Sequence, residues 1–189
     1  VKRKQRETGR TIGLYPETKA PSRFASLGFD FARLLLDALV ANGLEGPGAR
    51  VFIQSFEPEV LRQLNSMTEL PLIMLVEPIS RDEPHRPNIP LTEVATFADG
   101  VGAFKMLLLN EAMESTGFVA SAHQLGLLVH VWTFRNDSYP QSVFTSPTDE
   151  ITRYLDLGID GFFTDFPDTG VAARDAFSQR MGVSAETAN

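Results

Sequence analysis

Short apolar segments recur along the chain, each rich in β-branched or aromatic residues. Most of their positions are apolar rather than alternating with polar ones, which is typical of parallel strands buried on both faces. Between them, apolar residues follow a helical period, as at Phe31, Leu34, Leu35 and Leu39. The pattern predicts repeated β-loop-α units, with strands over residues 11–15, 51–55, 70–76, 100–104, 127–134 and 161–164.

Glycines mark the ends of several predicted helices, because glycine readily adopts the left-handed conformation that ends many helices. They stand at Gly43, Gly126 and Gly158. The first ten residues have the character of the end of a helix that began upstream, so we expect the chain to be a fragment. A final helix is expected over residues 169–177, capped by Asp168 or Asp165, of which Asp168 is the better candidate. The alternative for Asp165 is that it orients another residue of the site.

Repeated βα units leave two architectures open, an open doubly wound sheet and a closed (β/α)8 barrel of the TIM type. No glycine-rich phosphate-binding fingerprint follows a predicted strand, which disfavours the nucleotide-binding version of the open sheet. We expect an α/β fold in which residues 1–180 supply about six C-terminal βα units of a (β/α)8 TIM-type barrel, with about two units missing from the front. Residues 181–189 are expected to be a frayed tail.

Composition narrows the possible functions. The chain has 189 residues and a formal net charge of −7, which disfavours a nucleic-acid partner. It has no cysteine, so disulfides, thiol catalysis and zinc–thiolate sites are excluded. The longest apolar runs are too short to span a bilayer, and we expect no transmembrane segment. Because the chain is negatively charged overall, an anionic substrate would need a local positive centre, such as a lysine or a metal ion.

The segment IGLYPETK places a carboxylate and an ammonium two residues apart after a predicted strand. Side chains at i and i+2 of an extended chain point the same way, so Glu17 and Lys19 would face one site at the carboxyl end of the strand. A carboxylate can bind a hard divalent cation, and a lysine can hold an anion such as phosphate. The alternative is an exposed loop ion pair of little consequence.

A second candidate segment is VFIQSF, at the end of another predicted strand. Gln54 can donate to or accept from a bound polar group, and Phe56 can form an apolar wall of the site. Ser55 can belong to this site or can simply cap the helix that Pro58 helps to start, and the two interpretations have equal weight.

A third candidate lies in LLVHVWTF, where strand alternation places His130, Trp132 and Phe134 on one face. An aromatic side chain at a barrel mouth can pack on the carbons of a small ligand, and an aromatic core layer is the competing interpretation. His130 lies further down the strand, which favours a core histidine over a catalytic one. His85 and His123 have no sequence neighbour that suggests a nucleophile pair.

Four segments, in their order and spacing, resemble the glycerophosphodiester phosphodiesterase family, and most closely its bacterial extracytoplasmic glycerophosphoryl diester phosphodiesterase branch. They are IGLYPETK, VFIQSFEPEVL, GLLVHVWTFRND and GFFTDFPDTGV. The resemblance implies a (β/α)8 barrel that hydrolyses small-molecule glycerophosphodiesters to glycerol 3-phosphate and an alcohol, with Ca²⁺ or Mg²⁺ as cofactor. It also implies that Glu17 binds the metal, that Lys19 contacts the phosphate, and that Phe56 and Trp132 line the glycerol side, with Gln54 as a further substrate-binding residue.

The sequence departs from the family's pattern at its front. The family's His-Arg-Gly strand, its early acidic metal pair and its catalytic histidines belong ahead of IGLYPETK, so no catalytic residue is assigned within this chain. We expect the chain alone to have little activity. Two alternatives stay open: a non-catalytic truncated barrel that binds a partner or a phosphorylated ligand, and a phospholipase D-like barrel phosphodiesterase. We expect a periplasmic or extracellular location; the head group, the metal and the oligomeric state are left open.

Overall fold

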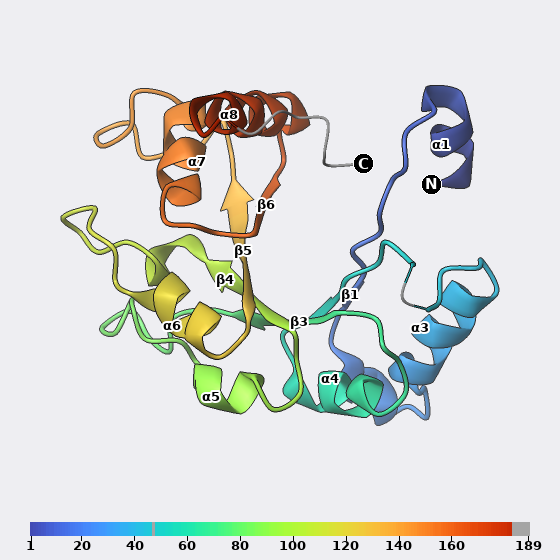
Figure 1. Cartoon of the computed structure of the whole chain (residues 1–189). Coiled ribbons are helices and arrows are strands. Elements are labelled where there is room, and N and C mark those ends of the chain that lie inside the picture. The colour runs from blue at the N-terminus through green and yellow to red at the C-terminus, as the bar shows by residue number, and fades with distance from the viewer. Residues whose placement is uncertain (47, 183–189) are drawn as a thin grey trace. The chain divides into compact units, whose positions relative to one another are not determined.

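The computed structural model describes residues 1–46 and 48–182, in which strands and helices alternate along the chain (Figure 1). These residues form two compact units. The first contains residues 1–76, 89–102 and 125–127, and the second contains residues 77–88, 103–124 and those from Leu128 onward. Residues 183–189, most of the predicted frayed tail, lie outside the described residues.

The first unit is built on strands that pair in parallel with the next strand along the chain. Its strands are β1 (Glu17–Thr18), β2 (Ile53–Ser55), β3 (Leu72–Val76) and the start of β4 (Gly100–Phe104). Its helices are α1 (Lys2–Thr8), α2 (Pro21–Ala25), α3 (Phe31–Val40), α4 (Pro58–Asn65) and α5 (Leu91–Val94). β1 pairs with β2, and β2 pairs with β3. Two hydrogen bonds between Leu72 and Asp99, of 2.8 and 2.9 Å, place the start of β4 beside the start of β3.

The core of the first unit lies between β3 and the helices beside it. Every residue of β3 is buried, and α4 packs its apolar stripe, Val60, Leu61 and Leu64, against this sheet. At Gly102 a Cβ atom would come within 2.5 Å of Leu75 Cδ2, so the strands approach closely at this position because glycine lacks a side chain.

The second unit combines one strand pair with the helices that pack on it. Its elements are the 3₁₀ helix η1 (Lys105–Leu107), α6 (Phe118–Gln124), β5 (Leu128–Phe134), α7 (Pro147–Leu155), β6 (Gly161–Thr164) and α8 (Pro167–Arg180). β5 and β6 are parallel. Ser146 is the N-cap of α7, and its side chain accepts a hydrogen bond from the Asp149 amide at 3.1 Å. α7 packs against both α8 and β5 (Figure 1).

Five of the six predicted strands are confirmed. β4 and β6 occupy the predicted residues, and β2, β3 and β5 begin one or two residues later than predicted. The strand predicted over residues 11–15 is wrong: there only Leu14 forms an isolated bridge, to Val51, and β1 begins at Glu17. Pro16 stands between the two pairings, and because proline has no amide hydrogen it interrupts the ladder. The consequence is that Glu17 lies within a strand rather than after one.

The predicted helix ends agree with the structure except at the last helix. Gly43, Gly126 and Gly158 all have positive φ angles, of 65°, 76° and 86°. The cap predicted at Asp168 is wrong, because α8 begins at Pro167 after Phe166 and Asp168 lies inside its first turn. Proline fixes φ near its helical value and its missing amide costs nothing at the first helical position, which moves the start of the helix forward. Among the described residues, no helix is both long enough and apolar enough to cross a membrane.

Candidate active site

Glu17 and Lys19 form an ion pair at the carboxyl end of β1. Lys19 Nζ lies 3.2 Å from Glu17 Oε2. The Glu17 side chain is only 21% exposed, whereas the Lys19 side chain is 80% exposed. The carboxylate is thus held in place by its surroundings, while the ammonium extends into solvent on a flexible chain and can move to another anion.

Gln54 lies directly beside Glu17 on the neighbouring strand. The two residues are register partners of parallel β1 and β2, so their side chains leave the same face of the sheet. Gln54 is only 8% exposed, and its Oε1 has no hydrogen-bond partner within the described part of the chain. A buried carbonyl oxygen without a donor is costly, and such exceptions commonly mark sites that accept a ligand or ion.

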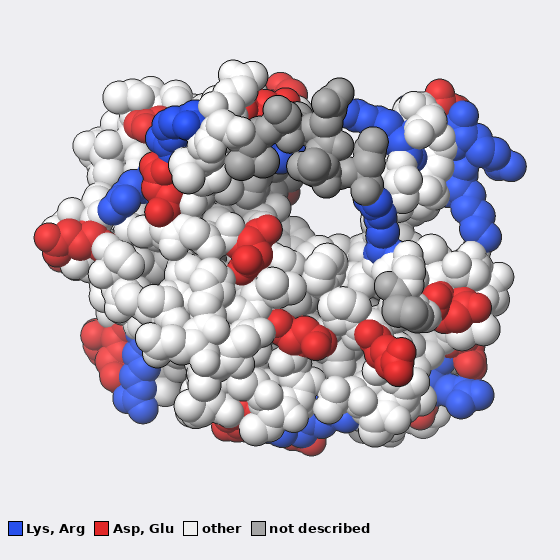
Figure 2. Space-filling view, viewed as in Figure 1, with Lys and Arg blue, Asp and Glu red and all other residues white. Residues whose placement is uncertain are grey.

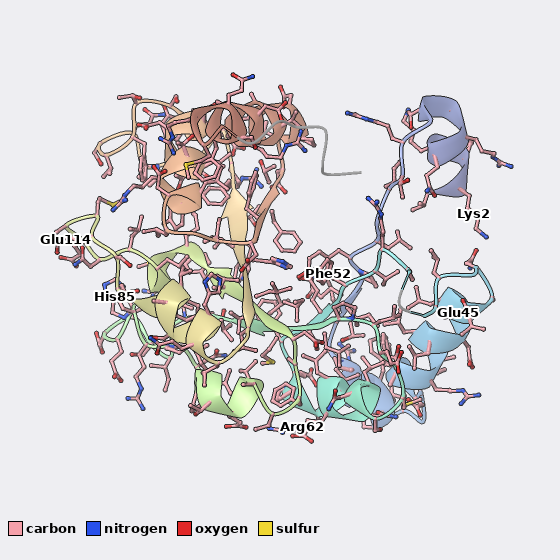
Figure 3. The ribbon with its side chains drawn as sticks, in the orientation of Figure 1. Lys2, Glu45, Phe52, Arg62, His85 and Glu114 are labelled. Atoms are coloured by element: carbon pink, nitrogen blue, oxygen red, sulfur yellow. The ribbon has the colours of Figure 1, made fainter. Side chains whose placement is uncertain are left out.

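An aromatic layer precedes this pair on the same two strand segments. The rings of Tyr15 and Phe52, which lie two residues before Glu17 and Gln54 respectively, have centroids 5.2 Å apart. Phe52 is labelled in Figure 3. Burial raises the pKa of the Tyr15 hydroxyl well above its usual range, so this side chain stays neutral at physiological pH. Glu17 and Gln54 therefore follow a layer of uncharged aromatic side chains.

Ser55 serves the local fold. Its hydroxyl donates to the Thr18 carbonyl at 3.4 Å and accepts from the Glu57 amide at 3.0 Å, and its side chain is fully buried. These bonds join the ends of β1 and β2 and turn the chain toward α4, whose N-cap residue is Glu57 rather than Ser55. Phe56, between them, is 40% exposed at the carboxyl end of β2.

Trp132 lies in the second unit, on β5, where its ring packs against Phe104 with centroids 4.9 Å apart. The prediction that His130, Trp132 and Phe134 share one face is wrong for Phe134. Between Val131 and Phe134, β5 advances three residues while β6 advances two. This bulge turns Phe134 to the side of α7, where its ring lies 5.1 Å from that of Tyr154.

Each histidine of the described residues is either buried or in contact with a neighbouring oxygen atom. His130 is buried beside Gly161, where a Cβ would come within 2.8 Å of the imidazole Cδ2, and burial lowers the pKa of His130 while the charge of Asp160 opposes that shift. His85 Nδ1 lies 2.7 Å from the Met106 carbonyl oxygen, and His123 Nε2 lies 2.9 Å from Asp160 Oδ2.

Sequence reasoning missed a guanidinium at the carboxyl ends of β5 and β6. Arg135 donates to both carboxylate oxygens of Asp137 at 2.9 Å and also to Asp165. The hydrogen bond from Arg135 lowers the pKa of Asp137. The signal was present as the Arg-x-Asp triplet directly after a strand, but only the structure shows that Asp165, from the next strand, joins it.

Charge is unevenly distributed in the chain. Basic residues gather over α1, as Figure 2 shows in blue, and acidic residues are dispersed over the rest of the face in view. In the described residues no group of three or more histidines, cysteines or acids could hold a metal ion. Glu17 and the unpartnered oxygen of Gln54 nevertheless offer two adjacent oxygen donors, the ligand type that hard divalent cations prefer. They fit part of a cation's coordination shell.

The fold defines the class of protein. The chain superposes on a putative glycerophosphoryl diester phosphodiesterase from Silicibacter pomeroyi with a TM-score of 0.63 at 21% identity, covering 95% of this chain and 54% of that one. It also superposes on an Oleispira antarctica phosphodiesterase, solved with the product sn-glycerol-3-phosphate, with a TM-score of 0.54 at 14% identity, covering 87% and 56%. These likenesses confirm the predicted fold class, an α/β chain of the (β/α)8 TIM-barrel type.

The sequence then gives the family. The model of the glycerophosphoryl diester phosphodiesterase family matches residues 3–169, so the chain belongs to this family. It is 29% identical to a glycerophosphodiester phosphodiesterase of Haemophilus influenzae, covering 88% of this chain and 54% of that protein. It is 27% identical to one of Bacillus subtilis, covering 85% and 48%. The chain thus spans about half the length of the curated relatives it matches.

Proposed function

We propose that this chain carries the substrate-binding part of a glycerophosphodiester phosphodiesterase, which hydrolyses a glycerophosphodiester to glycerol 3-phosphate and an alcohol. The oxygen of a water molecule bonds to phosphorus as the water gives up a proton, the bond from phosphorus to the alcohol oxygen breaks, and the departing alkoxide takes up a proton. The observation that carries the proposal is the placement of Glu17, Lys19 and Gln54 together at the ends of two parallel strands. Membership of the family supports it.

The residues divide the work by charge. Glu17 and its neighbours would hold a divalent cation, Ca²⁺ or Mg²⁺, which when bound draws electron density from the phosphoryl oxygens. Lys19 contacts the phosphodiester anion, since its long exposed side chain can leave Glu17 for a second negative group. Phe56, half-exposed at the carboxyl end of β2, would offer an aromatic ring to the glycerol carbons.

A non-catalytic barrel that binds a phosphorylated ligand is the second candidate. It is favoured by the incomplete donor set, because only two adjacent oxygen donors are found at Glu17 and Gln54 within the described residues. It is also favoured by the histidines described above, because His85 and His123 contact other groups of the second unit and His130 is buried within it. The two candidates differ in turnover, not in ligand binding.

A turnover assay separates them. The chain, and the same chain extended by any residues that its gene encodes upstream of Val1, are incubated with glycerophosphocholine, with CaCl₂ or MgCl₂ and with EDTA. Release of glycerol 3-phosphate is followed by its dehydrogenase. We expect metal-dependent release from the extended chain and its loss in Glu17→Ala, with Glu59→Ala, on the exposed face of α4, as the matched control. Binding without turnover in every form would favour the non-catalytic candidate, and full activity of Glu17→Ala would remove the metal role of Glu17. A periplasmic or extracellular location remains part of this proposal.

A further inference from the structure

Gln54 carries a buried oxygen that the fold leaves unused. The residue is nine-tenths buried, and its Oε1 is one of three side-chain atoms in the described residues that are buried without a hydrogen-bond donor. Thr18 Oγ1 is another, but Thr18 alternates with Glu17 along β1 and leaves the opposite face of the sheet. Of the two such atoms in the first unit, only the Gln54 oxygen therefore shares the face of the Glu17 carboxylate.

The carboxylate of Glu17 beside the Gln54 oxygen favours a positively charged partner for that oxygen. Neighbouring parallel strands lie about 4.8 Å apart, so Gln54 and Glu17, as register partners, leave the same face of the sheet side by side. An ionised carboxylate has only acceptor sites, and a second acceptor beside it is electrostatically unfavourable unless something positive lies between them. The Lys19 ammonium reaches Glu17, yet it is mostly in solvent and bonds Oε2 at 3.2 Å without bonding to Gln54.

We propose that Gln54 Oε1 is a direct ligand of a hard divalent cation, adjacent to Glu17, and that Lys19 leaves Glu17 when the cation binds. This inference rests on the proposed function and adds a ligand to it. An amide oxygen is a neutral hard donor, so it adds a ligand without adding negative charge. The bound ion then keeps more of its positive charge for a phosphodiester anion than it would between two carboxylates.

The proposal is tested by metal binding rather than by turnover. Mn²⁺ alone is titrated into the full chain, and the free ion is counted by electron paramagnetic resonance. Gln54→Met keeps the length of the side chain and removes its amide group, including the oxygen, and we expect it to weaken Mn²⁺ binding about tenfold. Gln54→Glu adds a charged ligand and should tighten binding by a similar factor. Gln124→Met, at an exposed position of α6, is the matched control and should leave binding unchanged.

A second readout separates a ligand from a structural residue. Removing a buried unpartnered oxygen relieves a cost in the metal-free protein, so Gln54→Met should raise its melting temperature by a few degrees in EDTA. The same variant should lose the upward shift that CaCl₂ gives the parent chain. Equal Mn²⁺ affinity in Gln54→Met and the parent, or no Mn²⁺ binding by the parent chain, would overturn the proposal. A chain that binds Mn²⁺ through Gln54 and yet releases no glycerol 3-phosphate when extended would leave this inference standing and refute the proposed activity instead.

Discussion

Lys105 donates a 2.8 Å hydrogen bond to Glu150 Oε1, joining two residues 45 positions apart inside the second unit. Glu150 is 1% exposed and Lys105 17%, and the ammonium also lies 5.4 Å from the centre of the Phe134 ring. The other carboxylate oxygen, Glu150 Oε2, has no hydrogen-bond partner among the described residues. The buried carboxylate of Glu150 thus depends on Lys105 for most of the favourable interaction that offsets its loss of hydration.

Lys105→Met should lower the free energy of unfolding by about 3–5 kcal/mol, because it leaves a buried carboxylate without its counter-charge. Replacing both residues, Lys105→Met with Glu150→Leu, should recover most of this loss, since a buried ion pair is often no more stable than apolar residues of similar volume. Urea denaturation followed by circular dichroism measures both.

The matched control is Arg86→Met, which breaks an ion pair whose two side chains are at least half exposed. Its effect should stay below about 1 kcal/mol, because solvent screens the pair. If Lys105→Met were no more damaging than Arg86→Met, the buried pair would not hold the second unit together as described.

α8 crosses β6 at a glycine, and this contact gives a second prediction. An alanine Cβ at position 170 would lie 2.7 Å from Thr164 Cγ2 and 3.1 Å from Phe162 Cε2. Gly170→Ala should therefore lower the free energy of unfolding by about 1–2 kcal/mol, as crowding outweighs the gain of about 1 kcal/mol that alanine brings within a helix. Chemical denaturation of the variant measures the change.

Thr164→Ser provides the rescue, because it removes the methyl group that the new Cβ would meet and keeps the hydroxyl that accepts the Phe166 amide at 3.0 Å. The double variant Gly170→Ala, Thr164→Ser should be more stable than Gly170→Ala alone. A stabilising Gly170→Ala would show that α8 can move away from β6 at little cost.

The sequence predicted the strands well where an apolar run alone defines them. It predicted them less well where pairing with a neighbouring strand sets the start of a strand or the face of a side chain. β3 and β4 are buried runs that any register preserves. The start of β1 depends on a proline interrupting the pairing near Val51, and the face of Phe134 depends on a bulge against β6. Neither is visible from spacing within one segment, because each is set by the partner strand.

The candidate site divides in the same way. Glu17 and Lys19 are two residues apart, so their pairing could be predicted from spacing along one strand. That Gln54 faces Glu17 follows from the register of β1 on β2, which a single sequence does not state. That the Gln54 oxygen lacks a donor depends on everything packed around it, and no local pattern carries that information.

His130 gives a pH-dependent prediction for the second unit. Burial lowers the pKa of its imidazole below the unfolded value of about 6.5, while Asp160, the charged group acting on it, opposes the shift. A depressed pKa means that the folded protein binds fewer protons than the unfolded chain in this range, so this histidine's contribution is complete above about pH 6.5. Stability should fall as the pH drops from there toward the folded pKa, and the contribution levels off below it.

Denaturation of the parent and of His130→Asn between pH 5 and pH 8 measures the effect. The parent's free energy of unfolding should decline below about pH 6.5, with a slope of at most about 1.4 kcal/mol per pH unit from this one group. His130→Asn has no proton to bind there, so the gap between parent and variant should be constant above neutral pH and narrow at lower pH. A gap that stayed constant down to pH 5 would mean that the buried imidazole titrates equally in the folded and unfolded chains, and that its place beside Gly161 does not exclude the charged form.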